Sequence, residues 1–213
     1  MDLSYIGITV KSIYYFHLLN HIRNQLYLLY HFFASTFLLQ LFNLFFSSTN
    51  QTMGLLLPIH ILTYGYTLGS TTFHSFIASI KALDTLPRRQ FGDFQGAVLP
   101  IQFATQSIAP VVIALTAPYT LSTTGIALLV SSAAGGIANL AYLTPKCAVL
   151  KTKRWDIVDK DFNGDNEKAV ASGTVASIDK EFGKWHGASM AANMVSIVAM
   201  AAYGFVLSGK LKV

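Results

Sequence analysis

The sequence has little charge. Only 12% of its 213 residues are Asp, Glu, Lys or Arg, about half the share of roughly 25% that is usual in soluble domains. Hydrophobic residues make up 53% of the chain. A soluble fold of this size leaves much of its surface in water and cannot hide so much apolar surface. The composition therefore excludes an ordinary soluble domain and predicts an integral membrane protein.

Cysteine is almost absent, because Cys147 is the single one. An internal disulfide is excluded, and the redox compartment cannot be inferred. Cys147 is interpreted as a small residue near a helix end, with palmitoylation close to the membrane as the alternative. The sequence also lacks a nucleophile elbow, a Walker loop, an HExxH and a CxxC motif. We therefore expect no catalytic site and no cofactor.

The basic residues exceed the acidic ones, with a net charge of +5. They do not form an arginine-rich face interleaved with aromatic residues, which a nucleic-acid binder needs. They gather in segments that flank apolar stretches, where Lys and Arg orient a membrane protein. We expect the lipid bilayer as partner, and no nucleic acid.

Four apolar stretches are long enough to cross a bilayer, which takes roughly 20 residues. They run over residues 55–83, 97–117, 119–143 and 188–207. Only a tight turn at Pro118 separates the second from the third, so these two form an antiparallel pair. Pro110 is expected to kink the second. The predicted fold is an all-α, four-helix transmembrane bundle over residues 53–213.

Residues 1–52 differ in composition from the rest. They are rich in aromatic residues but hold one alanine, Ala34, and one glycine, Gly7. Residues 25–47 form a fifth apolar stretch, longer than the roughly 7–15 residues of a signal peptide core. This extension is either an extra lipid-facing helix or a leader before a core that begins at Met53.

The charges predict an orientation by the positive-inside rule. If the spans alternate, 13 of the 15 basic residues lie on one side, and only Lys210 and Lys212 lie on the other. The segment 146–186 is therefore predicted to be a cytoplasmic loop, with the C-terminus outside or in a lumen. We expect a multi-pass protein of an endomembrane or the plasma membrane.

Small residues recur at four-residue spacing in the spans. The pairs are Gly65 with Gly69, Gly135 with Asn139, Ser132 with Gly136, Gly187 with Ala191, and Ser189 with Asn193. Small residues let helices approach closely in lipid, where the hydrophobic effect does not drive association. These faces are predicted to pack the bundle, or to join it to other copies or other membrane proteins.

Polar residues inside the spans are the default functional candidates. They are His60, His74, Gln102, Gln106, Asn139 and Asn193, with His186 at the entry to the last span. One interpretation is interhelical hydrogen bonding, worth roughly 0.6 kcal/mol per contact. The alternative is a wet path for a small solute. Haem or metal binding is disfavoured, because His60 and His186 lie near opposite ends of the bilayer.

An acidic segment resembles the start of a calcium loop. Asp159, Asp161 and Asn163 take positions 1, 3 and 5, and Gly164 takes position 6. The twelfth position, where a bidentate Glu is expected, is Val170. We interpret this segment as a solvated, flexible acidic turn without a clear flanking helix.

The cytoplasmic edge is the second candidate site. Pro87 is expected to end the first helix, which holds Arg88 and Arg89 on a fixed turn. Arg88 is then expected either to pair with Glu181 or, together with Arg89, to hold an anionic lipid headgroup.

Three motifs together resemble the transmembrane protein 205-like family, a eukaryotic membrane family with a domain of unknown function. The matching residues are Leu86, Pro87, Arg88, Phe91, Gly92, Gln95 and Pro100, then Asn139 and Leu143 to Lys146 with Pro145, then Phe182, His186, Gly187, Ser189 and Asn193, with His60 at the family's spacing before the first motif. Thr144 replaces an acidic residue of the second motif, and residues 1–52 have no counterpart. The resemblance implies a four-helix core and no agreed reaction.

These observations lead to three hypotheses. The first is a non-enzymatic protein that packs with itself or with other helices and supports membrane trafficking or solute handling. The second is a small-solute transporter or channel component. The third, a haem- or metal-binding membrane enzyme, has the weakest support.

Overall fold

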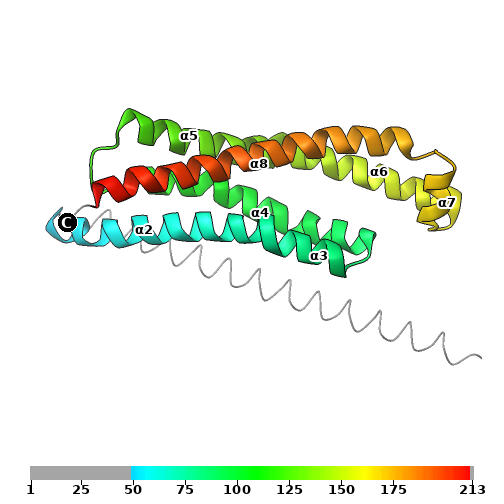
Figure 1. Ribbon diagram of the computed structural model, residues 1–213, viewed down its shortest axis with the longest axis horizontal. Helices are drawn as coiled ribbons and strands as arrows, with labels where there is room; N and C mark the ends of the chain where they lie inside the picture. Colours follow the sequence, from blue (N-terminus) through cyan, green and yellow to red (C-terminus); the bar gives the residue numbers. More distant parts are fainter. Residues whose placement is uncertain (1–48, 212–213) are drawn as a thin grey trace, which may run out of the picture. The chain divides into compact units, whose positions relative to one another are not determined.

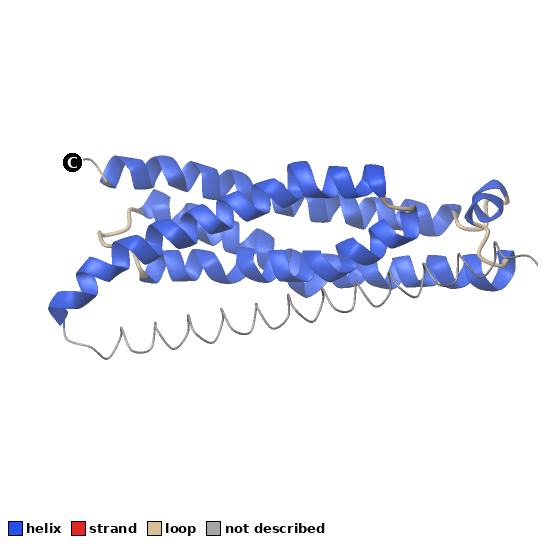
Figure 2. Cartoon of the chain, turned by 90° about the horizontal axis from the view of Figure 1, so that it is seen from below, coloured by secondary structure: helices blue, strands red, loops and turns tan. Residues whose placement is uncertain are grey.

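The computed structural model describes residues 49–211, with side chains from residue 54 onward. Within this range all regular secondary structure is helical (Figures 1 and 2). The part from Leu55 onward forms one compact unit. The predicted apolar stretch at residues 25–47 lies outside the described residues.

The helices follow one another with short connections. Their bounds are α2 Thr49–Phe73, α3 Ser79–Thr85, α4 Arg88–Leu115, α5 Thr123–Ala138, α6 Thr144–Phe162, α7 Asn166–Ala171 and α8 Ala176–Lys210. Two π-helical turns join them without a break, η1 at His74–Ala78 between α2 and α3 and η2 at Asn139–Leu143 between α5 and α6. Such turns are rare and are frequent at functional positions.

Three helices of the described part are long and apolar enough to cross a membrane. They are Arg88–Leu115, the continuous run Thr123–Phe162, and Ala176–Lys210. The all-α membrane fold is thus confirmed. The first expected span, 55–83, is helical but is not among these three. Residues 63–72 of this stretch are Gly, Thr, Ser and Tyr apart from Leu68, which lowers its hydropathy. Its passage through the bilayer stays a prediction.

The predicted loop at 146–186 is mostly helical, which corrects the sequence analysis. α6 runs on to Phe162, α7 follows, and α8 begins at Ala176. Apolarity marks where the bilayer ends, whereas a helix continues until a residue interrupts its hydrogen bonds. Pro145 does not interrupt the run, because it lies in the first turn of α6 directly after η2.

The expected helix pairing is confirmed. Residues 116–122 connect α4 to α5, and α5 packs extensively against both α4 and α8. A core of Ile113, Leu129, Met200, Tyr203 and Leu207 joins these three helices. The Pro118 turn is thus part of a seven-residue connection. α4 continues through both Pro100 and Pro110.

Two glycines bring the helices of this core close together. A Cβ at Gly136 would lie 2.8 Å from the carbonyl carbon of Gln106 on α4, and a Cβ at Gly135 would overlap Ser196 on α8. The predicted packing role of this small-residue face is borne out by these contacts. By contrast, Cβ atoms at Gly65, Gly69 and Gly187 would meet no neighbour.

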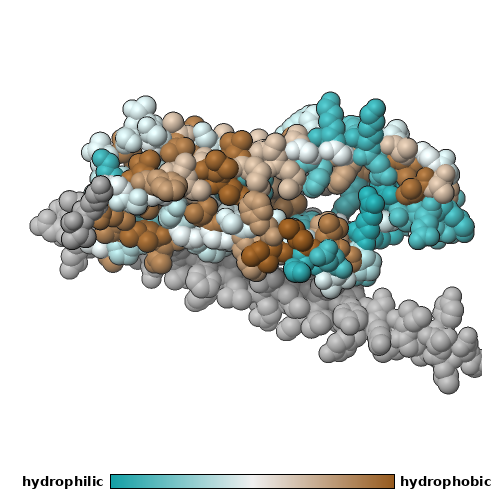
Figure 3. All heavy atoms as spheres, in the orientation of Figure 1, coloured by the Kyte–Doolittle hydropathy of each residue, from teal (hydrophilic) through white to brown (hydrophobic). Residues whose placement is uncertain are grey.

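The surface of the bundle separates into two zones. Apolar side chains cover much of the visible face, while hydrophilic residues gather at the end that carries α6, α7 and the start of α8 (Figure 3). Large apolar side chains such as Leu62, Val130, Val198 and Phe205 are well exposed. This outward apolar face is what a lipid environment requires.

Candidate functional site

The interior of the bundle is polar to an unusual degree. The buried polar side chains in the helical core are His60, Thr67, Thr71, His74, Gln102, Gln106, Thr116, Ser132, Asn139, Ser189, Asn193 and Ser196. All six polar residues that the sequence placed inside spans are therefore buried. Their burial follows from the solvent, since a polar side chain in lipid costs free energy unless a partner satisfies it.

Asn193 of α8 is the centre of the first polar group. Its Oδ1 accepts hydrogen bonds from Gln106 Nε2 at 2.7 Å and from Gln102 Nε2 at 3.4 Å. Its Nδ2 donates to Ser75 Oγ at 2.9 Å. Gln102 and Gln106 lie one turn apart on α4, so both reach the same partner, as the sequence spacing predicted. We call these four residues the amide layer.

The amide layer is not fully satisfied. Gln102 Oε1 and Gln106 Oε1 are both buried and have no hydrogen-bond partner among the described residues. The Gln106 side chain as a whole is only 1% exposed. An unpaired buried polar atom costs roughly 1–3 kcal/mol. Each glutamine thus keeps one hydrogen-bonding atom free inside the bundle.

Asn139 and Ser189 form a second polar contact, between η2 and α8. Ser189 Oγ donates to Asn139 Oδ1 at 2.6 Å, and Asn139 Nδ2 donates to the Ser189 carbonyl at 3.1 Å. Asn139 is fully buried and is the first residue of the π-helical turn. These two motif residues, 50 positions apart in the sequence, therefore fasten η2 to α8.

His60 lies in a third polar group, close to the start of the 116–122 connection. Its Nε2 is 3.0 Å from the hydroxyl of Tyr203, which in turn is 3.0 Å from the hydroxyl of Tyr119. Thr116 Oγ1 approaches His60 Nδ1 at 3.5 Å. Both ring nitrogens thus have partners, which fixes α2 to α8 and to the connection.

His74, the first residue of η1, belongs to a fourth group with Ser79 of α3 and Gln95 of α4. Its Nε2 lies 3.1 Å from Gln95 Oε1 and 3.1 Å from Ser79 Oγ, and Gln95 Nε2 donates to Ser79 Oγ at 2.9 Å. The π-helical turn η1 begins at His74 and places Ser79 within reach of it. The motif residue Gln95 is thereby linked to the first helix.

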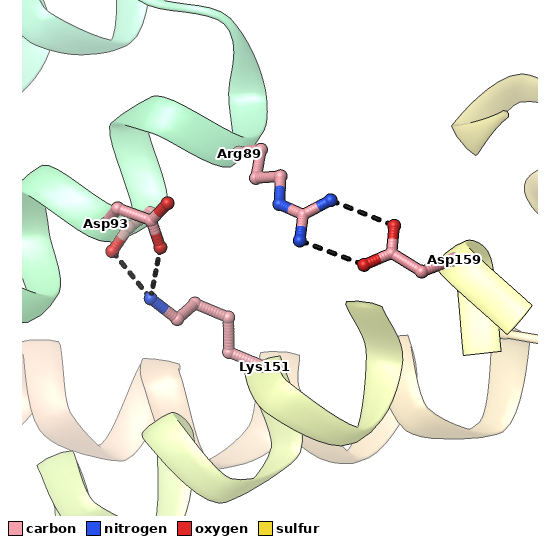
Figure 4. Close-up of polar contacts among 5 residues, drawn as sticks. Arg89, Asp93, Lys151 and Asp159 are labelled. Atoms are coloured by element: carbon pink, nitrogen blue, oxygen red, sulfur yellow. Dashed lines mark hydrogen bonds and ion pairs between the residues drawn. The ribbon is translucent and has the colours of Figure 1, made fainter. Parts of the chain in front are cut away.

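Ion pairs connect α4 to α6 at the charged end (Figure 4). The guanidinium of Arg89 donates to both carboxylate oxygens of Asp159 at 2.9 Å. The ammonium of Lys151 donates to Asp93 Oδ1 and to the Gly92 carbonyl, both at 3.0 Å. The two pairs have opposite polarity. In the first, α4 supplies the cation and α6 the anion, whereas in the second α4 supplies the anion and α6 the cation.

The expected pairing of Arg88 with Glu181 is wrong. Glu181 pairs with Lys146 at 3.3 Å. Arg88 is exposed at the first residue of α4 and has no salt bridge within residues 54–211. The arginines begin a helix and do not form a separate turn, although Pro87 does separate α3 from α4 as predicted.

The remaining motif residues lie around this charged end. Phe91 and Gly92 are half-buried, and a Cβ on Gly92 would lie 3.3 Å from Lys151 Cδ. Pro145 is exposed. His186 stacks on Phe182 with ring centroids 5.5 Å apart, and Gly187 is exposed. These residues do not converge on one point with the amide layer.

The acidic segment connects two helices, α6 and α7, which corrects the expectation that no clear helix flanks it. Asn163 and Gly164 both have positive φ, at 50° and 81°, and they end α6. Asp165 then caps α7 by accepting from the Lys168 N–H at 3.0 Å. This backbone hydrogen bond, with the Lys168 ammonium, holds the pKa of Asp165 below its usual value. The carboxylates of Asp159 and Asp165 are thus engaged in protein contacts.

Sequence reasoning missed several residues of these groups. Tyr203, Tyr119 and Ser75 were not singled out, because a hydroxyl on a helix face does not reveal its partner. The sequence offers one weak indication for Tyr203. It lies in the last span, where a buried phenol needs a hydrogen-bond partner. The ion pair of Arg154 with Asp179, at 2.6 Å, was missed as well, since its helix was taken for a loop.

A family model described as a domain of unknown function (DUF4149) matches residues 62–156, which includes Gln102, Gln106 and Asn139. "Xanthocillin biosynthesis cluster protein D" of Aspergillus fumigatus is 27% identical over 162 residues, which are 76% of this chain and 94% of that protein. No solved structure matches. These matches do not confirm the resemblance to the transmembrane protein 205-like family, which stays a prediction.

Proposed function

We propose that this chain is a multi-pass membrane protein that handles small uncharged polar solutes, with the amide layer as the place where such a solute binds. The observation that carries this proposal is the pair of free amide oxygens on Gln102 and Gln106. They lie within a bundle whose outside is apolar and whose inside is lined with hydroxyl and amide groups. A solute with N–H or O–H groups supplies the donors that these two oxygens lack.

The chemistry of the layer favours an uncharged solute. No Asp, Glu, Lys or Arg occurs between Asp93 and Lys146 in the sequence, so the part of α4 and α5 around the layer offers no counter-charge. An ion in a low-dielectric interior requires such compensation. Urea and glycerol fit better, because each carries several donors and acceptors without net charge.

The residues of the amide layer come from three elements of the bundle. Gln102 and Gln106 come from α4, Asn193 from α8 and Ser75 from η1. A solute held at the Oε1 atoms of Gln102 and Gln106 would turn the same amide groups whose Nε2 atoms bind Asn193. A change in the hydrogen bonds of Asn193 therefore affects how α4, α8 and η1 pack together. Solute binding can in this way be coupled to a movement of the helices.

The test is solute flux into liposomes that contain the purified full chain. Stopped-flow light scattering follows swelling with urea and, separately, with glycerol. We expect swelling faster than in protein-free liposomes, and a return to the protein-free rate in the double variant Gln102→Leu, Gln106→Leu. Leucine keeps a similar volume but offers no hydrogen bond.

The matched control is Ser131→Ala. Ser131 is also polar and within a span, but it is exposed and bonds only to the Ala127 carbonyl at 2.8 Å. This variant should keep the native rate. If the native protein swells its liposomes no faster than empty ones with both probes, the proposed function is rejected.

A second candidate function is association with other membrane helices, favoured by the open face of Gly65 and Gly69. These glycines, with Leu68 and Phe73, line an apolar hollow on the described surface between α2 and α8. A GxxxG face of this kind lets another helix approach closely. Cross-linking in liposomes tests it: Gly65→Leu should lower the yield of cross-linked species, whereas Gly209→Leu near the C-terminus should not.

A further inference from the structure

Arg154 of α6 is buried at the charged end of the bundle and is only partly paired. It is 6% exposed. Its Nε donates to Asp179 Oδ1 at 2.6 Å. Both terminal nitrogens, Nη1 and Nη2, are buried and have no partner within the described residues. A guanidinium carries five N–H donors, so most of the hydrogen-bonding capacity of Arg154 is unused.

A second guanidinium shares an aromatic neighbour with Arg154. Its Cζ lies 5.0 Å from the centre of the Trp155 ring, and the Cζ of Arg89 lies 5.1 Å from the same ring. One indole thus contacts two guanidinium groups.

Three other carboxylates of α4, α6 and α8 are already engaged by cations. Asp159 binds Arg89, Asp93 binds Lys151, and Glu181 binds Lys146. Asp179 reaches only Nε of Arg154. The two terminal nitrogens therefore require an acceptor from outside these ion pairs.

We propose that Arg154 binds a phosphate-type anion through Nη1 and Nη2, while Asp179 orients its guanidinium through Nε. This site is separate from the amide layer and independent of the solute proposed there. The terminal edge of a guanidinium presents parallel N–H groups that match two oxygens of a phosphate. An ammonium group at this position lacks that fork.

The anion has two possible sources with the same chemistry. Trp155 and Trp185 lie at this end of the bundle, and tryptophan is enriched where a membrane meets water. A phosphate group is available there from an anionic lipid headgroup and also from solution. Both sources present the same phosphate chemistry to Arg154, so an experiment must test a lipid and a soluble phosphate separately.

The experiment measures the melting temperature of the full chain in a neutral detergent. One series adds inorganic phosphate against chloride at constant ionic strength. The other adds short-chain phosphatidic acid to the micelles, with phosphatidylcholine of the same chain length as reference. We expect a saturable rise in melting temperature in at least one series. A rise only with phosphatidic acid identifies a headgroup, and a rise with phosphate identifies a soluble anion.

The variants test whether Arg154 is responsible. Arg154→Gln should raise the half-saturating concentration about tenfold, as expected for the loss of a charge-assisted contact, and Arg154→Lys should weaken binding too. Lys153→Gln removes the same charge from an exposed neighbour and should leave binding unchanged. Asp179→Asn should tighten binding, because it removes the competing negative charge.

Two results would overturn the proposal. One is the absence of a saturable rise with both probes in the native protein. The other is an equal response of Arg154→Gln and the native protein. If Arg154→Gln fails to fold, Asp179→Asn decides, and anion binding no tighter than in the native protein counts against the site.

Discussion

A methyl group added at Gly136 is expected to destabilise the bundle through a clash with α4. The Cβ of Gly136→Ala would lie 2.8 Å from the carbonyl carbon of Gln106 and from the nitrogen of Ser107, and 2.9 Å from Gln106 Cβ. Two of these three atoms belong to the backbone, so no side-chain rotation relieves the contact. The helices must move apart by several tenths of an ångström.

The cost can be worked out from a comparison with an open glycine. Overpacking a tight interface costs typically about 1–3 kcal/mol. Alanine also stabilises a helix by up to about 1 kcal/mol relative to glycine, and this gain applies equally to Gly69→Ala, whose Cβ meets no neighbour. The difference between the two variants thus isolates the clash. At roughly 2–4 °C per kcal/mol for a chain of this size, Gly136→Ala should melt about 2–12 °C below Gly69→Ala.

The assay heats each full-length variant in detergent and follows the loss of the monodisperse gel-filtration peak. Gly69→Ala should equal or slightly exceed the native protein. Equal melting temperatures of Gly136→Ala and Gly69→Ala would refute the close packing of α5 on α4. Because the clash displaces Gln106, Gly136→Ala should also lower the solute flux proposed above.

Four further predictions concern orientation, the extension and the charged end. A C-terminal tag should be protected from protease added to the cytoplasmic face of sealed vesicles, and its digestion there would reverse the topology. A protein that begins at Met53 should insert and persist in membranes, and its loss while the full chain persists would make residues 1–52 part of the core. A double-mutant cycle of Arg89→Gln and Asp159→Asn, measured by chemical denaturation, should give a coupling free energy below about 1 kcal/mol. The side chains are 51% and 42% exposed, and water screens such pairs. A larger coupling would contradict this expectation. Arg88→Ala should reduce co-purified anionic lipid, whereas Lys210→Ala at the opposite end should not, and equal lipid in both would remove the headgroup role of Arg88.

The fold was largely predictable from the sequence because the bilayer imposes a simple rule. Uncharged stretches of sufficient length, such as 97–117, become helices since lipid offers no other partner for the backbone. The ends of the helices were less predictable. Residues 146–162 and 176–186 are charged enough to lie in water and still continue their helices, so apolarity alone could not find Phe162 or Ala176 as the true limits.

The individual residues of the candidate site could be predicted from the sequence, but their contacts with one another could not. Gln102, Gln106 and Asn193 stood out because polar side chains are rare in spans. Their meeting at Asn193 Oδ1 depends on contacts across 87 and 91 residues of sequence, which no local spacing encodes. For the same reason Arg88 was assigned to Glu181, whereas Glu181 pairs with Lys146 of α6 at 3.3 Å.

The alternation of charge between α4 and α6 has an electrical consequence. Arg89 with Asp159 and Lys151 with Asp93 place one cation and one anion on each helix. The two charges on each helix cancel. A membrane potential changes the energy of an unbalanced charge that crosses it by about 2.3 kcal/mol per 100 mV. If α4 slides along α6, these four residues therefore move no net charge through that potential. The same sliding, however, brings like charges toward each other once Arg89 approaches Lys151. The two ion pairs therefore favour one register of the two helices, and these four charges add nothing to its voltage dependence.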